Sequence, residues 1–354
     1  MALPFLDKAA RKRTNIAAID LGGRTTKAVA LQRMGDGFGL VNFVVQDAPV
    51  FAKSFSPEVL ADHLRSVTQA LGARTKQVSV AVSVTDALLR RAELPQAPVA
   101  DLRAMLKFNA KTYLQQDLPD HVFDCLILPI GPQSSGGEPP KVAQKCRVLV
   151  AGAKKDFVAG VQAAIKAAGL TADTITPGIV GTANAFEFAQ PEAFGKDAVA
   201  LVDVGFKNSS IVILLKGELI LNRVVGIGGD KITSGLAEAM SISYAEAEGI
   251  KIGMPTEVQA VLQALLSPLG RELRASIDFF EHQQDKTVSQ VYFSGGSARS
   301  EFLVHTLQTE LMVPCRTWNP AGFLTLSLPP ERVAEIEQVS PQLNVAVGTA
   351  VAEF

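Results

Sequence analysis

Two short stretches of this sequence share an order of residue types that could bind an anion. The first reads DLGGRTTKAVAL at residues 20–31, and the second reads DVGFKNSSIVIL at residues 203–214. Each follows an apolar run, begins with Asp, has Gly two positions later, continues with hydrogen-bond donors and returns to apolar residues. In both places this pattern predicts a strand, a polar turn and a second strand.

The residues of the two turns have the chemistry of a phosphate-binding loop. Asp20 and Asp203 stand where strands end, and a carboxylate buried there is costly unless a cation or a donor accompanies it. Gly22 and Gly205 allow the backbone to bend and to approach a ligand. Donor groups at the tips form an anion-binding concavity. These donors belong to Gly23, Arg24, Thr25, Thr26 and Lys27 in the first turn, and to Lys207, Asn208 and Ser209 in the second.

The duplication decides between two interpretations of these turns. A single copy is most simply an ordinary hairpin with a polar turn. Two copies, one in each half of the chain, instead predict two similar domains that close over one polyphosphate. A Mg²⁺ ion between Asp20 and Asp203, which would keep most of its waters, fits such a site. Whether the base of the nucleotide is adenine or guanine stays open.

Two further segments carry residues that suit a nucleoside. VSQVYFSGGSARSEFLVHTLQTEL at residues 288–311 predicts a strand, a turn at Gly295 and Gly296, and a helix that begins near Ser297. Paired glycines at the carboxyl end of a strand allow a nucleoside or phosphate to come close. In AEAEGIKIG at residues 245–253, Glu248 and Lys251 share a helix face. The plainer alternatives are a simple strand–helix connection and a solvated ion pair.

The bulk composition excludes several classes of protein. The chain has 354 residues, of which 47% are hydrophobic, and its formal net charge is −1. It therefore lacks a general field that would attract nucleic acid, and its length predicts more than one domain. Its 3 cysteines and 4 histidines are dispersed, which argues against a disulfide framework or a zinc site. The sequence shows no secretory signal and no apolar run of about 20 residues, so a cytoplasmic protein is predicted.

The four motifs, in this order, resemble those of the actin-like ATPase superfamily. Over residues 14–354 the chain is most similar to the PilM family of type IV pilus assembly proteins. DLGGRTTK and DVGFKNSS look like the two phosphate loops, and the Glu248–Lys251 pair looks like the Glu-x-x-Lys pair that contacts the ribose and adenine side. The adenosine loop would contain Gly295, Gly296, Ser297 and Arg299, and the glycine-rich segment VGIGGDKIT at 225–233 would contribute Gly228, Gly229 and Asp230.

The resemblance implies an α/β, actin-like fold, in which a ribonuclease H-like unit is duplicated to give two lobes and four subdomains. Subdomain 1C is the insertion that PilM shares with the cell-division protein FtsA. Helical spacing predicts a mostly helical subdomain 2B, and hinges are expected near 177–197 and 330–345. The expected boundaries are 14–77, 177–195 and 342–354 for 1A, 78–176 for 1C, 196–229 and 286–341 for 2A, and 230–285 for 2B.

The function implied by the resemblance is that of a cytoplasmic, ATP-binding and Mg²⁺-binding scaffold of type IV pilus assembly. Its implied partner is a PilN-like inner-membrane protein, whose N-terminal cytoplasmic tail it would bind, so that it is peripheral at that membrane. Other pilus inner-membrane and motor proteins are further candidate partners. Glu187, in the connector helix GTANAFEFAQP at 181–191, is the one candidate for positioning a hydrolytic water. We therefore expect at most weak ATPase activity.

Two alternatives use the same fold. A small-metabolite kinase would need a second polar pocket, but the sequence between the first hairpin and residue 200 reads as a compact insert with ordinary core patterning. An FtsA-like cell-division protein would need a basic amphipathic helix after the globular domain, whereas this sequence ends in NVAVGTAVAEF. The first 13 residues combine Leu3, Phe5 and Leu6 with basic side chains and could touch an anionic membrane; a frayed terminus is the plainer interpretation.

Overall fold

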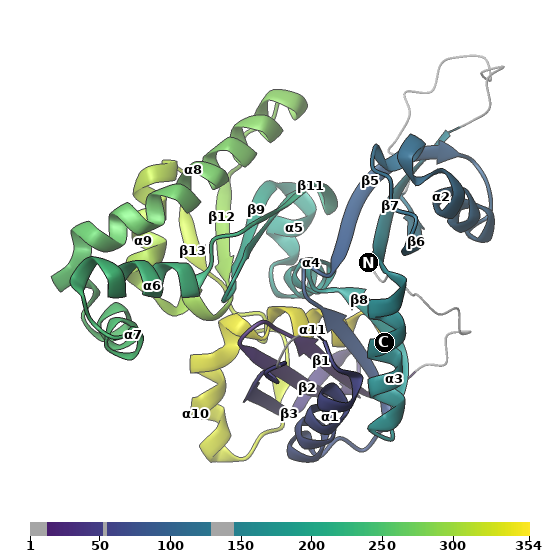
Figure 1. Cartoon of the computed structure of the whole chain (residues 1–354), viewed down its shortest axis with the longest axis horizontal. Helices are drawn as coiled ribbons and strands as arrows, with labels where there is room; N and C mark the ends of the chain where they lie inside the picture. Colours follow the sequence, from purple (N-terminus) through teal and green to yellow (C-terminus); the bar gives the residue numbers. More distant parts are fainter. Residues whose placement is uncertain (1–12, 52–54, 129–144) are drawn as a thin grey trace.

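The chain folds around two large β-sheets, and each contains one of the two predicted hairpins (Figure 1). The structure is a computed structural model that describes residues 13–51, 55–128 and 145–354. The first sheet has the strand order β14-β3-β2-β1-β4-β8. Its strands are β1 (Asn15–Leu21), β2 (Thr25–Met34), β3 (Gly37–Asp47), β4 (Gln77–Val82), β8 (Thr171–Pro177) and β14 (Thr325–Leu326). Helices α1 (Pro57–Leu71) and α3 (Lys155–Ala167) share an apolar core with it, and together they form the first lobe.

The second sheet repeats the plan of the first. Its order is β11-β10-β9-β12-β13. Its strands are β9 (Ala198–Val204), β10 (Ser209–Leu215), β11 (Glu218–Val225), β12 (Gln290–Ser294) and β13 (Cys315–Thr317). In both sheets three antiparallel strands are followed by a parallel strand beside the first of them. The register places Asp20 opposite Lys27 and Asp203 opposite Ser210. The duplication predicted from the two hairpins is therefore a duplication of the whole sheet.

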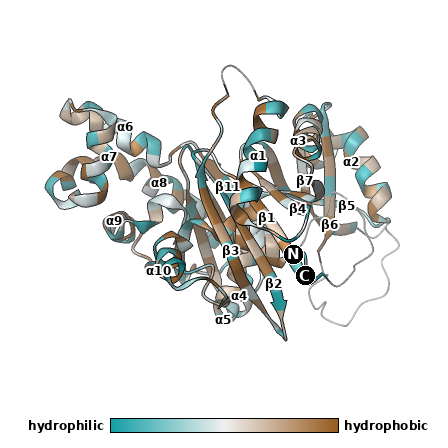
Figure 2. Cartoon of the chain, turned by 90° about the horizontal axis from the view of Figure 1, so that it is seen from below, coloured by the Kyte–Doolittle hydropathy of each residue, from teal (hydrophilic) through white to brown (hydrophobic). Residues whose placement is uncertain are grey.

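Helices cover the second sheet and complete the second lobe. They are α6 (Gly229–Met240), α7 (Tyr244–Gly253), α8 (Gln259–Gln284) and α9 (Glu301–Leu311), with a 3-10 turn at Pro255–Val258. Buried leucines and Phe280 of these helices pack on one face of the sheet. The region 230–285 is mostly helical, as predicted. Figure 2 shows that the strands are coloured mainly as hydrophobic, while helices such as α1 and α6 carry both colours, as expected where one helix face is buried.

The predicted helix start after the paired glycines is wrong by one turn. Gly296–Arg299 form a 3-10 turn, and the α-helix begins at Glu301. The Ser300 side chain is the reason, because its oxygen accepts a hydrogen bond from the Leu303 main-chain N–H at 3.3 Å. Such a bond satisfies one of the free donors in the first turn and fixes where the helix starts. Ser297 is thereby left in the turn that faces the space between the lobes.

Two small-residue helices lie between the lobes and join them. Helices α4 (Gly178–Ala189) and α11 (Asn344–Val351) contribute to one core that also contains side chains from both sheets, such as Leu31 and Leu201. The two helices meet at Gly181 and Gly348, where a Cβ atom built on Gly348 would lie 1.7 Å from the Gly181 carbonyl oxygen. Only glycine permits so close an approach of two helix backbones. Short helices α5 (Pro191–Lys196) and α10 (Pro330–Val339) flank this region.

A third, smaller sheet is inserted between β4 and α3. It has the order β5-β7-β6, with β5 (Ala87–Pro95), β6 (His121–Ile127), β7 (Lys145–Lys154) and helix α2 (Val99–Leu114). On one face these elements have an apolar core of their own that includes Leu102, Leu106 and Val150, whereas Leu89 and Leu149 belong to the core that contains side chains from both large sheets. The sequence pattern within 78–176 predicts a helix at 98–114 and strands at 121–130 and 142–153, and α2, β6 and β7 lie at these places. The outer part of each predicted strand falls in residues 129–144, outside the described residues, as does most of the basic N-terminal segment.

The four-subdomain boundaries expected from the sequence stay predictions, although the three sheets are compatible with them. No helix within residues 13–51, 55–128 or 145–354 is long and apolar enough to cross a membrane.

Candidate functional site

A cavity of about 410 Å³ lies between the two lobes. This volume falls within the range of about 300–1,000 Å³ that is usual for small-molecule sites. Its walls come from the β1–β2 and β9–β10 turns, the β4–β5 connection, helix α7, the segment after β12 and the start of α11. The predicted residues that line it are Asp20, Gly22, Gly23, Arg24, Thr25, Lys27, Asp203, Gly205, Lys207, Asn208, Gly229, Glu248, Lys251, Gly295, Gly296, Ser297 and Arg299.

The first hairpin places an ion pair at the wall of the cavity. The Lys27 ammonium lies 3.1 Å from Asp20 Oδ2, and both side chains are largely buried. Because Asp20 and Lys27 are paired in register across β1 and β2, their side chains emerge on the same face. Lys27 therefore faces the cavity. Gly22 is needed in this turn, since a Cβ atom there would lie 2.5 Å from the Thr25 carbonyl oxygen, a backbone atom, as well as 2.5 Å from Lys27 Nζ.

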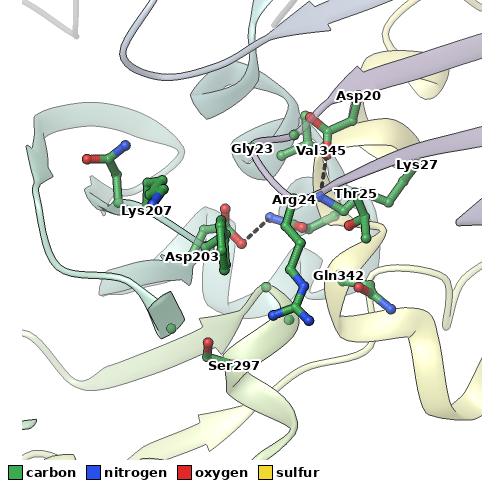
Figure 3. A pocket seen from close by; sticks show the side chains of 18 of the residues that line it. Asp20, Gly23, Arg24, Thr25, Lys27, Asp203, Lys207, Ser297, Gln342 and Val345 are labelled. Carbon is green, nitrogen blue, oxygen red and sulfur yellow. Dashed lines mark hydrogen bonds and ion pairs between the residues drawn. The ribbon is translucent and has the colours of Figure 1, made fainter. Parts of the chain in front are cut away.

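Asp203 is the half-buried acid that the second lobe contributes to the cavity wall, opposite the buried Asp20 of the first lobe. Its Oδ1 accepts a hydrogen bond from Asn344 Nδ2 at 3.2 Å and one from Ser294 Oγ at 3.4 Å. Burial raises the pKa of the Asp203 carboxyl, and Asp20 raises it further, whereas Lys27 lowers it. The two acids therefore interact electrostatically although they belong to different lobes, and Figure 3 shows both side chains at the pocket. A cation between them would relieve both the burial and the repulsion.

Helix α7 supplies the Glu248–Lys251 pair to the second-lobe wall. Lys251 Nζ lies 2.7 Å from Glu248 Oε2 and donates to Thr233 Oγ1 at 2.7 Å. Burial favours a higher pKa for Glu248, but Lys251 and Thr233 outweigh it and hold that pKa below its usual value. The pair is thus charged, partly shielded from water and held in one geometry by the helix spacing.

The start of α7 is fixed by a capping box. Ser243 Oγ accepts from the Glu246 main-chain N–H at 3.2 Å, and Glu246 Oε2 accepts from the Ser243 main-chain N–H at 2.8 Å. Replacing Ser243 with Ala removes the first bond, and we expect the protein to lose about 1 kcal/mol of stability. Chemical denaturation measures this loss. Threonine at the same position keeps the oxygen and serves as the control; equal losses for the two variants would contradict this role.

Gly295 brings the segment after β12 against the end of β9. Its φ angle is 93°, in the region that favours glycine. A Cβ atom at this position would lie 2.6 Å from the Val204 carbonyl oxygen and 2.7 Å from Asp203 Oδ1. Any other residue would push this segment away from Asp203 and widen the cavity.

Arg24 reaches from the first lobe to the second across the mouth of the cavity. One guanidinium nitrogen lies 3.8 Å from Glu248 Oε1. The guanidinium carbon also lies 5.2 Å from the centre of the Phe206 ring, within the range of a cation–π contact. Figure 3 shows this side chain extending over the cavity toward Ser297. Arg24 therefore contacts the second lobe directly in this conformation.

Four predicted residues support the cavity but do not line it. Thr26 alternates with Thr25 and Lys27 along β2, so it points to the opposite face, where its hydroxyl lies 2.8 Å from His63 Nε2. Ser209 is buried and donates to the Ile227 carbonyl oxygen at 2.6 Å. Asp230 accepts from Lys207 at 2.6 Å and from Tyr244 at 3.1 Å. Gly228 packs on Phe206, where a Cβ atom would lie 2.3 Å from its carbonyl oxygen.

Glu187 is not brought to this cavity. It lies on α4 and lines a small separate void with Asn184, Phe194 and Leu219. The acids that do line the main cavity in the described part of the chain are Asp20, Asp203 and Glu248.

Sequence reasoning missed Asn344. Its amide donates to Asp203, to Ser294 Oγ at 3.1 Å and to Thr182 Oγ1 at 2.8 Å, so it connects β9, β12 and α4. A signal was present, because Asn344 begins the otherwise apolar stretch NVAVGTAV. A buried amide in such a helix must find partners. Phe206, Gln342 and Ile252 also line the cavity and were not singled out.

Comparison with solved structures shows that the duplicated sheets and the cavity between them define an actin-like fold. A chain of the PilM-PilN type IV pilus biogenesis complex superposes with a TM-score of 0.81 at 22% identity, and covers 96% of this chain and 99% of that chain. The ethanolamine utilization protein EutJ from Carboxydothermus hydrogenoformans gives 0.54 at 15% identity, with 97% and 91% covered. MreB5 of Spiroplasma citri bound to AMPPNP gives 0.53 at 10% identity, with 97% and 96% covered.

The family itself is shown by the sequence. Residues 18–354 match the family model of the type IV pilus assembly protein PilM, and the chain therefore belongs to the PilM family. This match supports the pilus assembly interpretation over the kinase and cell-division alternatives, and the fold confirms the predicted α/β, actin-like architecture.

Proposed function

We propose that this protein is a scaffold of type IV pilus assembly that binds Mg·ATP between its two lobes. The observation that carries this proposal is the placement of Asp20 and Asp203. They occupy equivalent positions in two repeated sheets and meet at one cavity lined by basic and amide donors. A polyphosphate would satisfy these donors from both lobes at once, so it favours the closed arrangement by its differential affinity.

The donor set fits Mg²⁺ held mainly by water and phosphate. Magnesium is commonly bound by one or two carboxylates together with substrate phosphates. Asp20 and Asp203 supply that number, and a cation beside the Asp203 carboxyl would oppose the rise in its pKa that burial and Asp20 cause. Within the described residues no group of three or more His, Cys, Asp or Glu side chains could hold a metal by itself. When bound, the ion would neutralise phosphate charge, while Asp20 and Asp203 would orient its waters.

Nucleotide acts in this proposal as a conformational ligand. Glu187 is remote from the cavity, and the three acids at its wall are engaged by Lys27, by Asn344 and by Lys251. Among the described residues, every acid at the cavity wall thus has a partner and none is left free to serve as a base toward a water. Slow or absent turnover is expected, and a radiolabelled ATP assay with the purified protein measures it.

The proposed partner is the N-terminal cytoplasmic tail of a PilN-like inner-membrane protein. The support is membership in the PilM family and the likeness to a chain of the PilM-PilN complex. Through this partner the protein would lie at the cytoplasmic face of the inner membrane.

Two binding experiments with the full chain test the two parts of the proposal: calorimetry tests the nucleotide site, and fluorescence anisotropy tests the partner. Titration with Mg·ATP and with Mg·GTP should show saturable binding of at least one nucleotide. Titration with ATP plus EDTA should show weaker binding, because the site depends on magnesium. Fluorescence anisotropy of a labelled peptide from the PilN tail of the same organism should then show binding whose affinity changes with Mg·ATP. No heat for either nucleotide would overturn the nucleotide site. A scrambled peptide that binds as well as the native one would overturn the partner.

A further inference from the structure

One carboxylate joins the third sheet to the edge of the second lobe. Glu218 is the first residue of β11, which is the edge strand of the second sheet. Its Oε1 accepts hydrogen bonds from Arg91 on β5 and from Arg147 on β7, the latter at 3.1 Å. We call these three residues the Glu218 clamp. Strands β5 and β11 are also in contact.

The two arginines are arranged to hold one carboxylate together. Arg91 is paired in register with Leu149, and Arg147 lies two residues from Leu149 on β7. With a side-chain period of two, both arginines project from the same face of the third sheet. The side chains are between a quarter and two fifths exposed, at 28% for Glu218, 25% for Arg91 and 40% for Arg147. Without Glu218, two like charges would remain close together and partly buried.

The clamp lies where the covalent chain provides no link. The third sheet and α2 are inserted between β4 and α3, so the backbone connects them to the first lobe only. The Glu218 clamp ties the same unit to the second lobe, beside an apolar contact in which Leu89 and Leu149 of the third sheet share a core with Leu219 of β11. Rotation of one lobe against the other must therefore either carry the third sheet with the second lobe or break both the clamp and this apolar contact.

Two of the three strands of the clamp, β11 and β5, also lead to the cavity. Strand β11 ends at Val225, and the chain then reaches Gly229 at the cavity wall. On the other side, Ser83 and Val84 line the cavity and β5 begins at Ala87. Eight residues of extended strand span about 25 Å. Two rigid strands thus connect the nucleotide cavity with the clamp.

We propose that the Glu218 clamp makes the third sheet move with the second lobe when the lobes rotate, so that the state of the cavity is transmitted to that sheet. The nucleotide dependence rests on the proposed function of the cavity, whereas the tether does not. The coupling is a difference in free energy between two arrangements, and it is lost when the clamp is removed.

Distance measurements between three labelled positions test the proposal. Spin labels are placed in pairs on the exposed residues Gln69 of α1, Lys111 of α2 and Gln263 of α8. Cys315 is replaced with Ser so that it does not react with the spin label. Cys125 and Cys146 can stay, because both are buried. In the parent chain, addition of Mg·ATP should shift the Gln69–Lys111 and Gln69–Gln263 distances and leave the Lys111–Gln263 distance unchanged. In Glu218→Gln, Mg·ATP should still shift the Gln69–Gln263 distance, because the lobes still rotate. The Lys111–Gln263 distance should now shift as well, because the third sheet no longer follows the second lobe.

The matched control is Glu272→Gln. Glu272 forms an ion pair with Arg223, which also lies on β11, but both residues belong to the second lobe. This variant should behave as the parent chain does. Without nucleotide, Glu218→Gln should already broaden the Lys111–Gln263 distance distribution, and this readout is independent of the nucleotide site. Equal widths in Glu218→Gln and the parent would overturn the clamp. If Glu218→Gln broadens the Lys111–Gln263 distance distribution but the parent chain gives no calorimetric heat with Mg·ATP, the proposed function is overturned and the tether is retained.

Discussion

Replacing Asp203 with Asn is expected to weaken the binding of Mg·ATP at least tenfold, which corresponds to about 1.4 kcal/mol. The Asp203 carboxylate is half-buried and accepts hydrogen bonds from Asn344 and Ser294. Asparagine has the same shape but no charge, so it removes one of the two anions that would orient the waters of Mg²⁺. The two dissociation constants are compared by calorimetry at fixed magnesium concentration.

A second titration separates charge from shape. With EDTA present, the parent chain and the Asp203 variant should bind ATP with similar affinity, because the carboxylate then no longer acts through the ion. Asp173→Asn is the matched control, since Asp173 is a buried acid of the first sheet that pairs with Arg13 instead of lining the cavity. An unchanged dissociation constant for Mg·ATP in the Asp203 variant would remove the assignment.

Replacing Gly348 with Ala is expected to destabilise the protein by about 3 kcal/mol. The added methyl group would lie 1.7 Å from the Gly181 carbonyl oxygen and 2.7 Å from the Ala185 main-chain nitrogen. Both obstacles are backbone atoms, so relief requires α4 and α11 to move apart. The better helix propensity of Ala, worth about 1 kcal/mol, does not offset this. Unfolding in urea, followed by circular dichroism, measures the change.

Gly249→Ala provides the control for Gly348→Ala. Gly249 is also inside a helix, but a Cβ atom there would meet no heavy atom within 4 Å. This variant should therefore gain up to about 1 kcal/mol from helix propensity alone. A Gly348→Ala variant that is as stable as the Gly249→Ala variant would show that the crossing of α4 and α11 is looser than the structure indicates.

The parts of the fold that the sequence predicts well are those specified by neighbouring residues. The hairpin at Asp20 and its repeat at Asp203 are each formed by one contiguous stretch of residues. Residue types, strand alternation and turn position in that stretch therefore predict the hairpin together. Alternation also explains an error. Thr26 was grouped with Thr25 and Lys27 as a donor, yet a strand directs alternate side chains to opposite faces, and Thr26 contacts His63 instead.

The parts that the sequence does not predict depend on residues brought together from distant segments. Asn344 reaches Asp203 and Thr182 only after the last helix has returned to the first lobe. Glu218 meets Arg91 and Arg147 only when a strand edge of one sheet lies against another sheet. The apolar stretch around Asn344 marks it as an unusual residue, but no local pattern identifies the partners of Asn344 or of Glu218. Glu187 shows the converse, since its place in a connector helix suited a role at the cavity, but the helix turns it toward Phe194.

The core that α4 and α11 share with both sheets also bears on how the molecule melts. Residues of the first sheet such as Leu31 and of the second such as Leu201 belong to one continuous apolar cluster. Denaturing either lobe alone would expose part of that cluster to solvent. Differential scanning calorimetry should accordingly record a single cooperative endotherm for this two-lobed protein, without a separate transition for each half.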